Sequence, residues 1–130
     1  MSNHSVFVYG TLKRGFGLHH YLESSEFVGV AQTVHRYFMA DRGCPMVFFL
    51  APPGVPLLPV SGELYTVNDK VRATLDRVEG VPHLYVPRPL AVILSSAGFC
   101  EAMIYMGAHN DRQDWTPAPV EDGCYCWTGK

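Results

Sequence analysis

The sequence predicts an α+β fold in which a helix packs against a small, partly closed β barrel. Most of the chain consists of short apolar segments rich in Val, Ile, Phe and Tyr and bounded by Gly or Pro, a pattern typical of strands. A single segment in the middle of the chain shows strong helical periodicity. Many strands with one inserted helix favour a barrel with the helix lying against it.

The chain is expected to form a single domain over residues 1–130. A length of 130 residues allows one hydrophobic core but is too short for two. From residue 111 the sequence becomes polar and carries two prolines, so residues 111–130 are expected to form a C-terminal tail. Trp115, Tyr125 and Trp127 predict that this tail packs back onto the domain.

The composition argues against nucleic-acid and membrane partners. With 48% hydrophobic and 17% charged residues and a formal net charge of −2, it is typical of a globular protein. Lys13 and Arg14 form the largest basic cluster, so binding through phosphate neutralisation is not expected. The first residues, MSNHS, lack the features of a signal peptide, and no apolar stretch is long enough to span a bilayer. We therefore expect a soluble, cytoplasmic protein.

The four cysteines and six histidines do not predict a metal site. Structural zinc sites usually use two closely spaced ligand pairs, whereas Cys124 and Cys126 are the only close pair of cysteines here. His19 and His20 are adjacent, but no third ligand is spaced to join them. Free thiols are expected in a protein without a secretory signal, and no metal or other cofactor is expected.

The strands and one helical turn follow in a simple order along the chain. Val6–Tyr9 predicts a short buried strand, and Leu18–Ser24 predicts a helical turn. Five further segments have the composition of strands, namely 26–40, 45–50, 60–67, 83–95 and 99–107. Residues 51–59 contain four prolines and predict a loop, because proline cannot donate to a sheet ladder.

The segment NDKVRATLDRVEG predicts one amphipathic helix. Asn68 is a favourable N-cap residue, and Gly80 stands where helices commonly end. Val71, Leu75 and Val78 line one face of the helix at the spacing that buries against a core.

The glycine-rich stretch YGTLKRGFG, which follows the first strand, suggests an anion-binding turn. Successive backbone N–H groups after a strand form a concave anion site when the chain turns tightly, as Gly10 permits. Thr11 adds a hydroxyl donor. A nucleotide phosphate loop is rejected, because Phe16 and Gly17 stand where the Lys-Ser/Thr pair is required. A plain surface turn, with Lys13 and Arg14 facing solvent, remains the alternative.

Glu79 is the carboxylate whose position suggests acid–base chemistry. It closes the predicted helix at the negative end of the helix dipole, which disfavours a charged carboxylate. Its neighbours Val78, Val81 and Pro82 are apolar, so desolvation is expected to raise its pKa as well. The alternative is a solvated glutamate at a frayed helix end.

Other catalytic templates are absent or weak. The chain has neither a G-x-S-x-G nor an H-E-x-x-H motif. Cys44 is followed by Pro45 and an apolar run, which favours a buried structural thiol over a nucleophile. Tyr85 and Tyr105 are expected to be half-buried strand residues whose hydroxyl groups could donate to a ligand. Arg88 could pair with Glu79 or a substrate, but a surface position is expected.

Four motifs in order resemble the γ-glutamylcyclotransferase superfamily. VFVYGTLKRG at residues 6–15 is similar to the signature of its small branch, the γ-glutamylamine cyclotransferases and avirulence-induced-protein-like members. VSGELYTV at 60–67, LDRVEGVPHLY at 75–85 and EAMIYMG at 101–107 resemble the later motifs, and GCPMV at 43–47 resembles a glycine-then-proline segment. One departure is that Arg88 stands one place later than the arginine of the family's Tyr-x-Arg pattern.

The resemblance implies a small mixed β barrel flanked by one or two helices, and it implies roles for particular residues. In the family, backbone amides of the turn after the first strand bind substrate, which here corresponds to Tyr9, Gly10, Thr11 and Leu12. The glutamate of the L-D-x-x-E-G element acts as acid and base, which here is Glu79. Tyr85 and Tyr105 are added as substrate-binding candidates.

The implied reaction converts a γ-glutamylamine, for example γ-glutamyl-ε-lysine, to 5-oxoproline and a free amine. The α-amine of the substrate attacks its own γ-carbonyl, so no enzyme nucleophile, metal or cofactor is needed. The turn amides would hold either the α-carboxylate or the carbonyl oxygen. Alternatives are a non-catalytic module that binds γ-glutamyl or other carboxylate metabolites, and a cyclotransferase for γ-glutamyl amino acids or glutathione. A deprotection enzyme acting on a biosynthetic γ-glutamyl intermediate is a further alternative.

Overall fold

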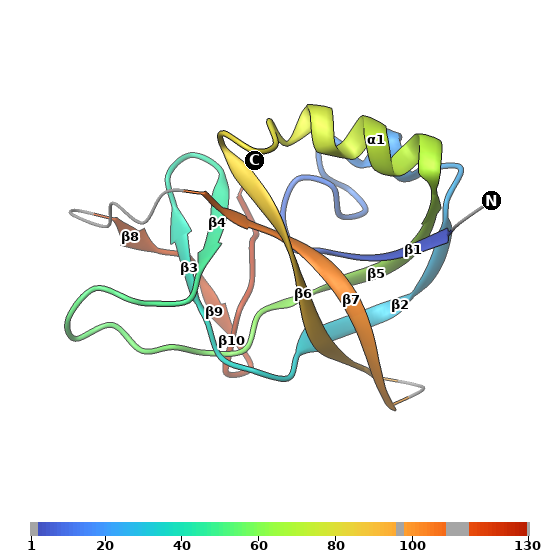
Figure 1. The fold of residues 1–130 in the computed structure, drawn as a ribbon. Coiled ribbons are helices and arrows are strands. Elements are labelled where there is room, and N and C mark those ends of the chain that lie inside the picture. Colours follow the sequence, from blue (N-terminus) through green and yellow to red (C-terminus); the bar gives the residue numbers. More distant parts are fainter. Residues whose placement is uncertain (1–2, 96–97, 109–114, 130) are drawn as a thin grey trace.

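A closed, five-stranded barrel forms the centre of the protein in the computed structural model, which describes residues 3–95, 98–108 and 115–129 (Figure 1). The strand order around the barrel is β1-β5-β2-β6-β7. All pairs are antiparallel except β1 with β7, whose parallel pairing at Val6–Met103 and Phe7–Ile104 closes the barrel. The predicted fold class, a small mixed barrel with a flanking helix, is confirmed, and the barrel closes fully.

The elements follow the expected order along the chain. They are β1 (Asn3–Val8), η1 (His19–Leu22), β2 (Glu26–Thr33), β3 (Phe38–Asp41), β4 (Pro45–Phe48), β5 (Ser61–Asn68), α1 (Asp69–Val78), β6 (Tyr85–Leu94), β7 (Gly98–Gly107), β8 (Thr116–Pro117), β9 (Val120–Glu121) and β10 (Cys124–Tyr125). The segment 26–40, expected as one stretch of strand, divides into β2 in the barrel and β3 in a second sheet of order β4-β3-β8.

The helix α1 begins and ends as its sequence predicts. The side chain of Asn68 accepts a hydrogen bond from the Val71 amide at 2.8 Å, which satisfies one of the free N–H groups of the first turn. Leu75 is fully buried and anchors the apolar face of the helix, which packs against η1, β1 and β5. No helix within the described ranges is long and apolar enough to cross a membrane.

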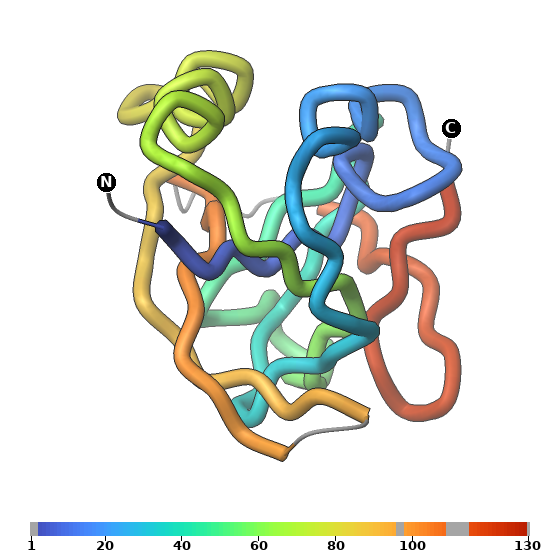
Figure 2. The backbone as a smooth tube through the Cα atoms, turned by 90° about the vertical axis from the view of Figure 1, so that its right-hand side faces the viewer, coloured from blue at the N-terminus to red at the C-terminus, as the bar shows by residue number. Residues whose placement is uncertain are grey.

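The described part of the C-terminal segment, residues 115–129, packs on the loop that precedes β5 and on the small sheet (Figure 2). The amide of Tyr125 donates to the carbonyl of Pro59, and its hydroxyl donates to that of Pro56. The ring of Trp115 lies 4.4 Å from that of Phe48, and Trp127 is buried. The start of the expected tail, residues 111–114, lies outside the described residues.

Candidate active site

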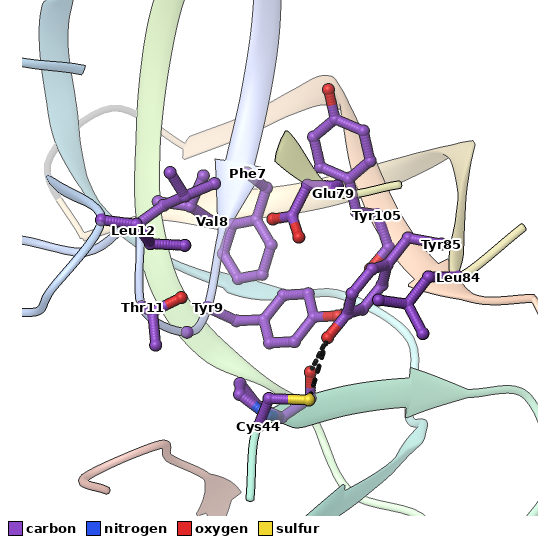
Figure 3. A pocket seen from close by; sticks show the side chains of 13 residues that line it. Phe7, Val8, Tyr9, Thr11, Leu12, Cys44, Glu79, Leu84, Tyr85 and Tyr105 are labelled. Carbon is purple, nitrogen blue, oxygen red and sulfur yellow. Dashed lines mark hydrogen bonds between the residues drawn. The ribbon is translucent and has the colours of Figure 1, made fainter. Parts of the chain in front are cut away.

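A cavity of about 170 Å³ lies where the end of β1, the end of α1 and strands β6 and β7 meet (Figure 3). It is lined by all seven residues singled out in the sequence, namely Tyr9, Gly10, Thr11, Leu12, Glu79, Tyr85 and Tyr105. The lining also includes residues that sequence reasoning did not assign to a site, namely Phe7, Val8, Leu18, Cys44, Pro45 and Leu84.

The turn after β1 has its carbonyl groups occupied and its amide groups free. The carbonyl of Gly10 accepts from the Lys13 amide at 3.0 Å, and that of Thr11 accepts from the Leu18 amide at 2.9 Å. The carbonyl of Leu12 accepts from Nδ1 of His19 at 3.0 Å. Within the described part of the chain, the N–H groups of Gly10, Thr11 and Leu12 donate no hydrogen bond. A turn in this state offers donors and no free acceptors, which suits an anionic or carbonyl oxygen.

Gly10 is required by the close approach of a second segment. A Cβ atom at this position would lie 2.5 Å from Cγ of Pro45, the residue that begins β4. The turn therefore packs directly on β4, and a side chain at Gly10 would displace one of them.

Lys13 and Arg14 lie outside the lining of the cavity, and the expectation that they face solvent is wrong for Lys13. The Lys13 side chain is buried, and its Nζ donates to the carbonyl of Trp127 at 2.9 Å. The Arg14 guanidinium stacks 3.5 Å from the centre of the Phe27 ring, and its amide donates to the carboxylate of Glu63 at 3.0 Å. Both residues stabilise the turn through these contacts, and neither lines the cavity.

Glu79 is the C-cap residue of α1, and backbone hydrogen bonds fix the turn that follows it. The amide of Gly80 donates to the carbonyl of Arg77, and the amide of Val81 donates to that of Asp76, with Gly80 at φ +67°. This pair of bonds is the Schellman arrangement that ends many helices, and it requires the left-handed conformation that glycine adopts readily.

The carboxylate of Glu79 projects into the cavity rather than into solvent (Figure 3). Burial raises its pKa from 4.5 to about 7. A carboxyl group with this pKa can take up and release a proton near neutral pH. The alternative of a solvated, frayed glutamate therefore does not describe this residue.

The three tyrosines contribute rings to the cavity wall and donate their hydroxyl protons to the protein. Tyr9 donates to the main-chain carbonyl of Tyr105 at 2.5 Å, and Tyr85 donates to that of Pro45 at 2.7 Å. Tyr105 donates to Oδ1 of Asp76 at 2.6 Å. The hydroxyl groups of Tyr85 and Tyr105 thus donate within the protein in this structure, and their expected role as donors to a ligand stays a prediction. Burial is the main cause that raises the pKa of each phenol, so all three stay neutral.

Cys44 differs from its expected buried position, whereas Arg88 has the expected surface position. Cys44 is only partly buried and lines the cavity, and its Sγ lies 3.7 Å from the Tyr85 hydroxyl oxygen. Arg88 is exposed on β6 and does not reach the cavity. Its shifted place leaves the strand register intact, because β6 pairs with β7 without a break from Tyr85 to Leu94. No group of three His, Cys, Asp or Glu residues in the described chain could hold a metal ion.

The chain is similar to known proteins over most of its length. Residues 6–127 match the family described as "Gamma-glutamyl cyclotransferase, AIG2-like". Gamma-glutamylaminecyclotransferase C of Danio rerio is 36% identical over 135 residues, covering 94% of this chain and 86% of the relative. Gamma-glutamylaminecyclotransferase of Homo sapiens is 36% identical over 97 residues, covering 68% of this chain and 61% of the relative.

A crystal structure of an AIG2-like protein from Mus musculus superimposes with a TM-score of 0.73 at 24% identity, covering 85% of this chain and 82% of that chain. This likeness shows a common fold. The resemblance inferred from the four sequence motifs is confirmed, and the chain belongs to the gamma-glutamyl cyclotransferase, AIG2-like family, whose named members support a cyclotransferase activity.

Proposed function

We propose that this protein converts a γ-glutamylamine to 5-oxoproline and the free amine, with Glu79 as general acid and base. The observation that carries the proposal is the meeting of two groups at one cavity. The carboxylate of Glu79 enters it from α1. Gly10, Thr11 and Leu12, whose N–H groups donate no hydrogen bond within the described chain, line it from the turn after β1.

The reaction depends on the orientation of the substrate more than on reactive groups of the protein. The α-amine nitrogen of the substrate bonds to its γ-carbonyl carbon, and the bond from that carbon to the leaving nitrogen then breaks. The α-ammonium loses two protons as it becomes the lactam N–H. Glu79 takes the first before the attack and delivers it to the leaving nitrogen, and the second goes to the released amine, which departs as an ammonium ion, so the carboxylate is regenerated. Holding the substrate in its curled form is worth up to ~7–11 kcal/mol of the barrier. A cavity of about 170 Å³ suits a compact γ-glutamyl group.

The free amides of the turn supply the electrostatic part of the mechanism. They can hold the α-carboxylate, which orients the substrate, or the carbonyl oxygen, on which negative charge develops during attack. In both cases the donors are already oriented, because the turn's own carbonyls are bonded elsewhere.

Two observations favour amines over amino acids as the leaving group. None of the described residues that line the cavity is Lys, Arg or His. A γ-glutamyl amino acid carries a carboxylate next to its leaving nitrogen, and this lining offers that carboxylate no cation. In γ-glutamyl-ε-lysine the carboxylate is a whole side chain away. Two relatives with about this level of identity are named gamma-glutamylaminecyclotransferases.

The test is an assay in which mass spectrometry measures the release of 5-oxoproline from γ-glutamyl-ε-lysine, γ-glutamyl-alanine and glutathione. We expect the first to be the best substrate, with kcat/KM rising with pH through about 7 as Glu79 ionises. Glu79→Gln is expected to lower kcat about 10²–10⁴-fold while its circular dichroism stays unchanged. Saturable binding of 5-oxoproline with no lactam formed from any of the three compounds would instead identify a binding module.

A further inference from the structure

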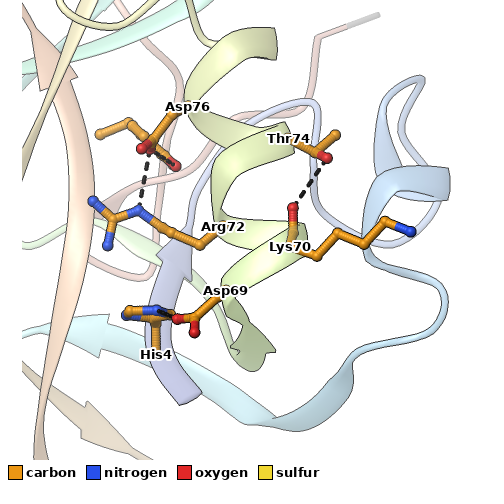
Figure 4. Close-up of polar contacts among 7 residues, drawn as sticks. His4, Asp69, Lys70, Arg72, Thr74 and Asp76 are labelled. Atoms are coloured by element: carbon orange, nitrogen blue, oxygen red, sulfur yellow. Dashed lines mark hydrogen bonds and ion pairs between the residues drawn. The ribbon is translucent and has the colours of Figure 1, made fainter. Parts of the chain in front are cut away.

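A polar contact ties the last turn of α1 to the barrel, immediately before Glu79. The hydroxyl of Tyr105, on β7, donates to Oδ1 of Asp76 at 2.6 Å. The same oxygen accepts from Nε of Arg72 at 3.1 Å (Figure 4). The Tyr105 ring lines the cavity, while its hydroxyl lies on the far side of the ring from Tyr85 (Figure 3).

Asp76 connects this contact to the backbone that holds Glu79. Its main-chain carbonyl accepts from the Val81 amide at 3.0 Å, which closes the turn that contains Glu79 and Gly80. Its side chain is thus bonded to β7 and its main chain to the turn. A movement of Asp76 away from β7 would move the Glu79 carboxylate with it.

The end of α1 has few other anchors to the barrel. Leu75 is its one fully buried side chain, and Val78 is only partly buried. A contact between His4 and Asp69 at 2.6 Å ties down the opposite end of the helix (Figure 4). The Tyr105–Asp76 bond joins a buried phenol to a carboxyl group that also forms a salt bridge with Arg72, so it belongs to the stronger class of hydrogen bonds.

We propose that Tyr105 is a positioning residue that acts through Asp76 to keep the Glu79 carboxylate inside the cavity, facing the turn amides. This inference rests on the proposed role of Glu79 as general acid and base. It assigns Tyr105 a task different from substrate binding, since its hydroxyl is already bonded to the helix.

The proton affinity of Glu79 provides a readout of its position. The titratable groups that line the cavity with it from other elements are Tyr9 at the end of β1, Tyr85 on β6, Tyr105 on β7 and Cys44 before β4. The three phenols are neutral and none of the described lining residues is a cation, so burial dominates the pKa of Glu79. If the last turn of α1 moves toward solvent, this pKa falls toward its ordinary value.

The experiment compares Tyr105→Phe, which keeps the ring, with the wild-type protein. Asp76→Ala removes the acceptor, Asp76→Asn keeps an oxygen acceptor, and His4→Ala removes the contact at the other end of the helix. For Tyr105→Phe and Asp76→Ala we expect kcat to fall about tenfold with a smaller change in KM. The acidic limb of the kcat–pH profile should move to lower pH. Asp76→Asn should recover most of kcat, and His4→Ala should leave the limb in place.

A titration of the Glu79 carboxyl carbon by NMR gives a second readout that needs no turnover. Its midpoint should lie lower in Tyr105→Phe than in the wild-type protein. An unchanged midpoint together with an unchanged kcat would overturn the positioning role, as would the same pH shift in His4→Ala. Absence of turnover in the wild-type protein, with the NMR shift still present, would contradict the proposed function and leave the positioning of Glu79 supported.

Discussion

The ammonium group of Lys13 donates a hydrogen bond to the main-chain carbonyl of Trp127, a residue 114 positions later in the chain, at 2.9 Å. Lys13 directly follows the three free amides of the candidate site, and its own amide closes their turn onto Gly10. The described C-terminal segment therefore supports the turn from the side opposite the cavity. A stretch of sequence with no catalytic motif thus has a structural part in the site.

Replacing Lys13 with methionine is expected to destabilise the protein. The substitution leaves the Trp127 carbonyl without its buried partner, so the free energy of unfolding should fall by about 1–3 kcal/mol. Urea denaturation of Lys13→Met measures this loss. Lys70→Met, at an exposed position on α1, is the matched control and should change stability little. Equal stability of the two variants would mean that the Lys13–Trp127 bond is not stabilising.

Replacing Gly10 with alanine is expected to impair the turn. The new Cβ would lie 2.5 Å from Cγ of Pro45, so the turn or β4 must move, at a cost of about 1–3 kcal/mol. We expect a higher KM in the 5-oxoproline assay, because the displaced amides no longer converge on the substrate. Gly17→Ala in the same loop has nothing within 4 Å of its Cβ and should behave like the wild-type protein. Wild-type kinetics in Gly10→Ala would argue against a binding role for these amides.

Replacing Gly80 with alanine tests the turn that carries Glu79. Gly80 has φ +67°, a conformation that costs a residue with a Cβ about 1–2 kcal/mol. Gly54 has φ +81° in a loop that does not line the cavity, so Gly54→Ala carries a similar backbone cost. We expect a loss of thermal stability in both variants, larger in Gly80→Ala because its Cβ would also lie 3.2 Å from Cβ of Leu84, but a loss of kcat in Gly80→Ala alone. Equal activities would show that Glu79 tolerates a displaced turn.

The buried carboxyl of Glu79 is expected to make the protein less stable as the pH rises. Its pKa is raised to about 7 in the folded state, so between pH 4.5 and 7 the folded state binds more protons than the unfolded state. Stability must then fall with rising pH through this window, by about 3 kcal/mol at most. Glu79→Gln removes this dependence. Its melting temperature should exceed that of the wild-type protein at pH 8, with a smaller difference at pH 4.5, and a variant less stable at pH 8 would contradict the burial of this carboxyl.

Features that depend on neighbours in the sequence could be predicted well. The helix has its N-cap at Asn68 and its terminal glycine at Gly80, because both signals act over three or four residues. The same signals predicted that Glu79 lies at the end of the helix. The family could also be inferred, since four short motifs in a fixed order are specific even when each alone is weak.

Features that depend on distant segments could not be predicted in this way. Nothing near Lys13 indicates that its ammonium is buried against Trp127, because a lysine after a glycine-rich turn usually faces solvent. The division of residues 26–40 between the barrel and a second sheet depends on pairing partners elsewhere in the chain. The sequence also could not predict that the hydroxyl of Tyr105 donates to Asp76 on the helix.

The sequence by itself determined most of the local elements, the family and seven of the residues that line the cavity, because caps, periodicity and motifs are properties of contiguous residues. Only the tertiary structure decided that the barrel closes through β1 and β7, which side chains hold the turn from behind, and where each tyrosine hydroxyl donates. These outcomes depend on which segments meet in space, and buried polar groups take whichever partner that meeting supplies.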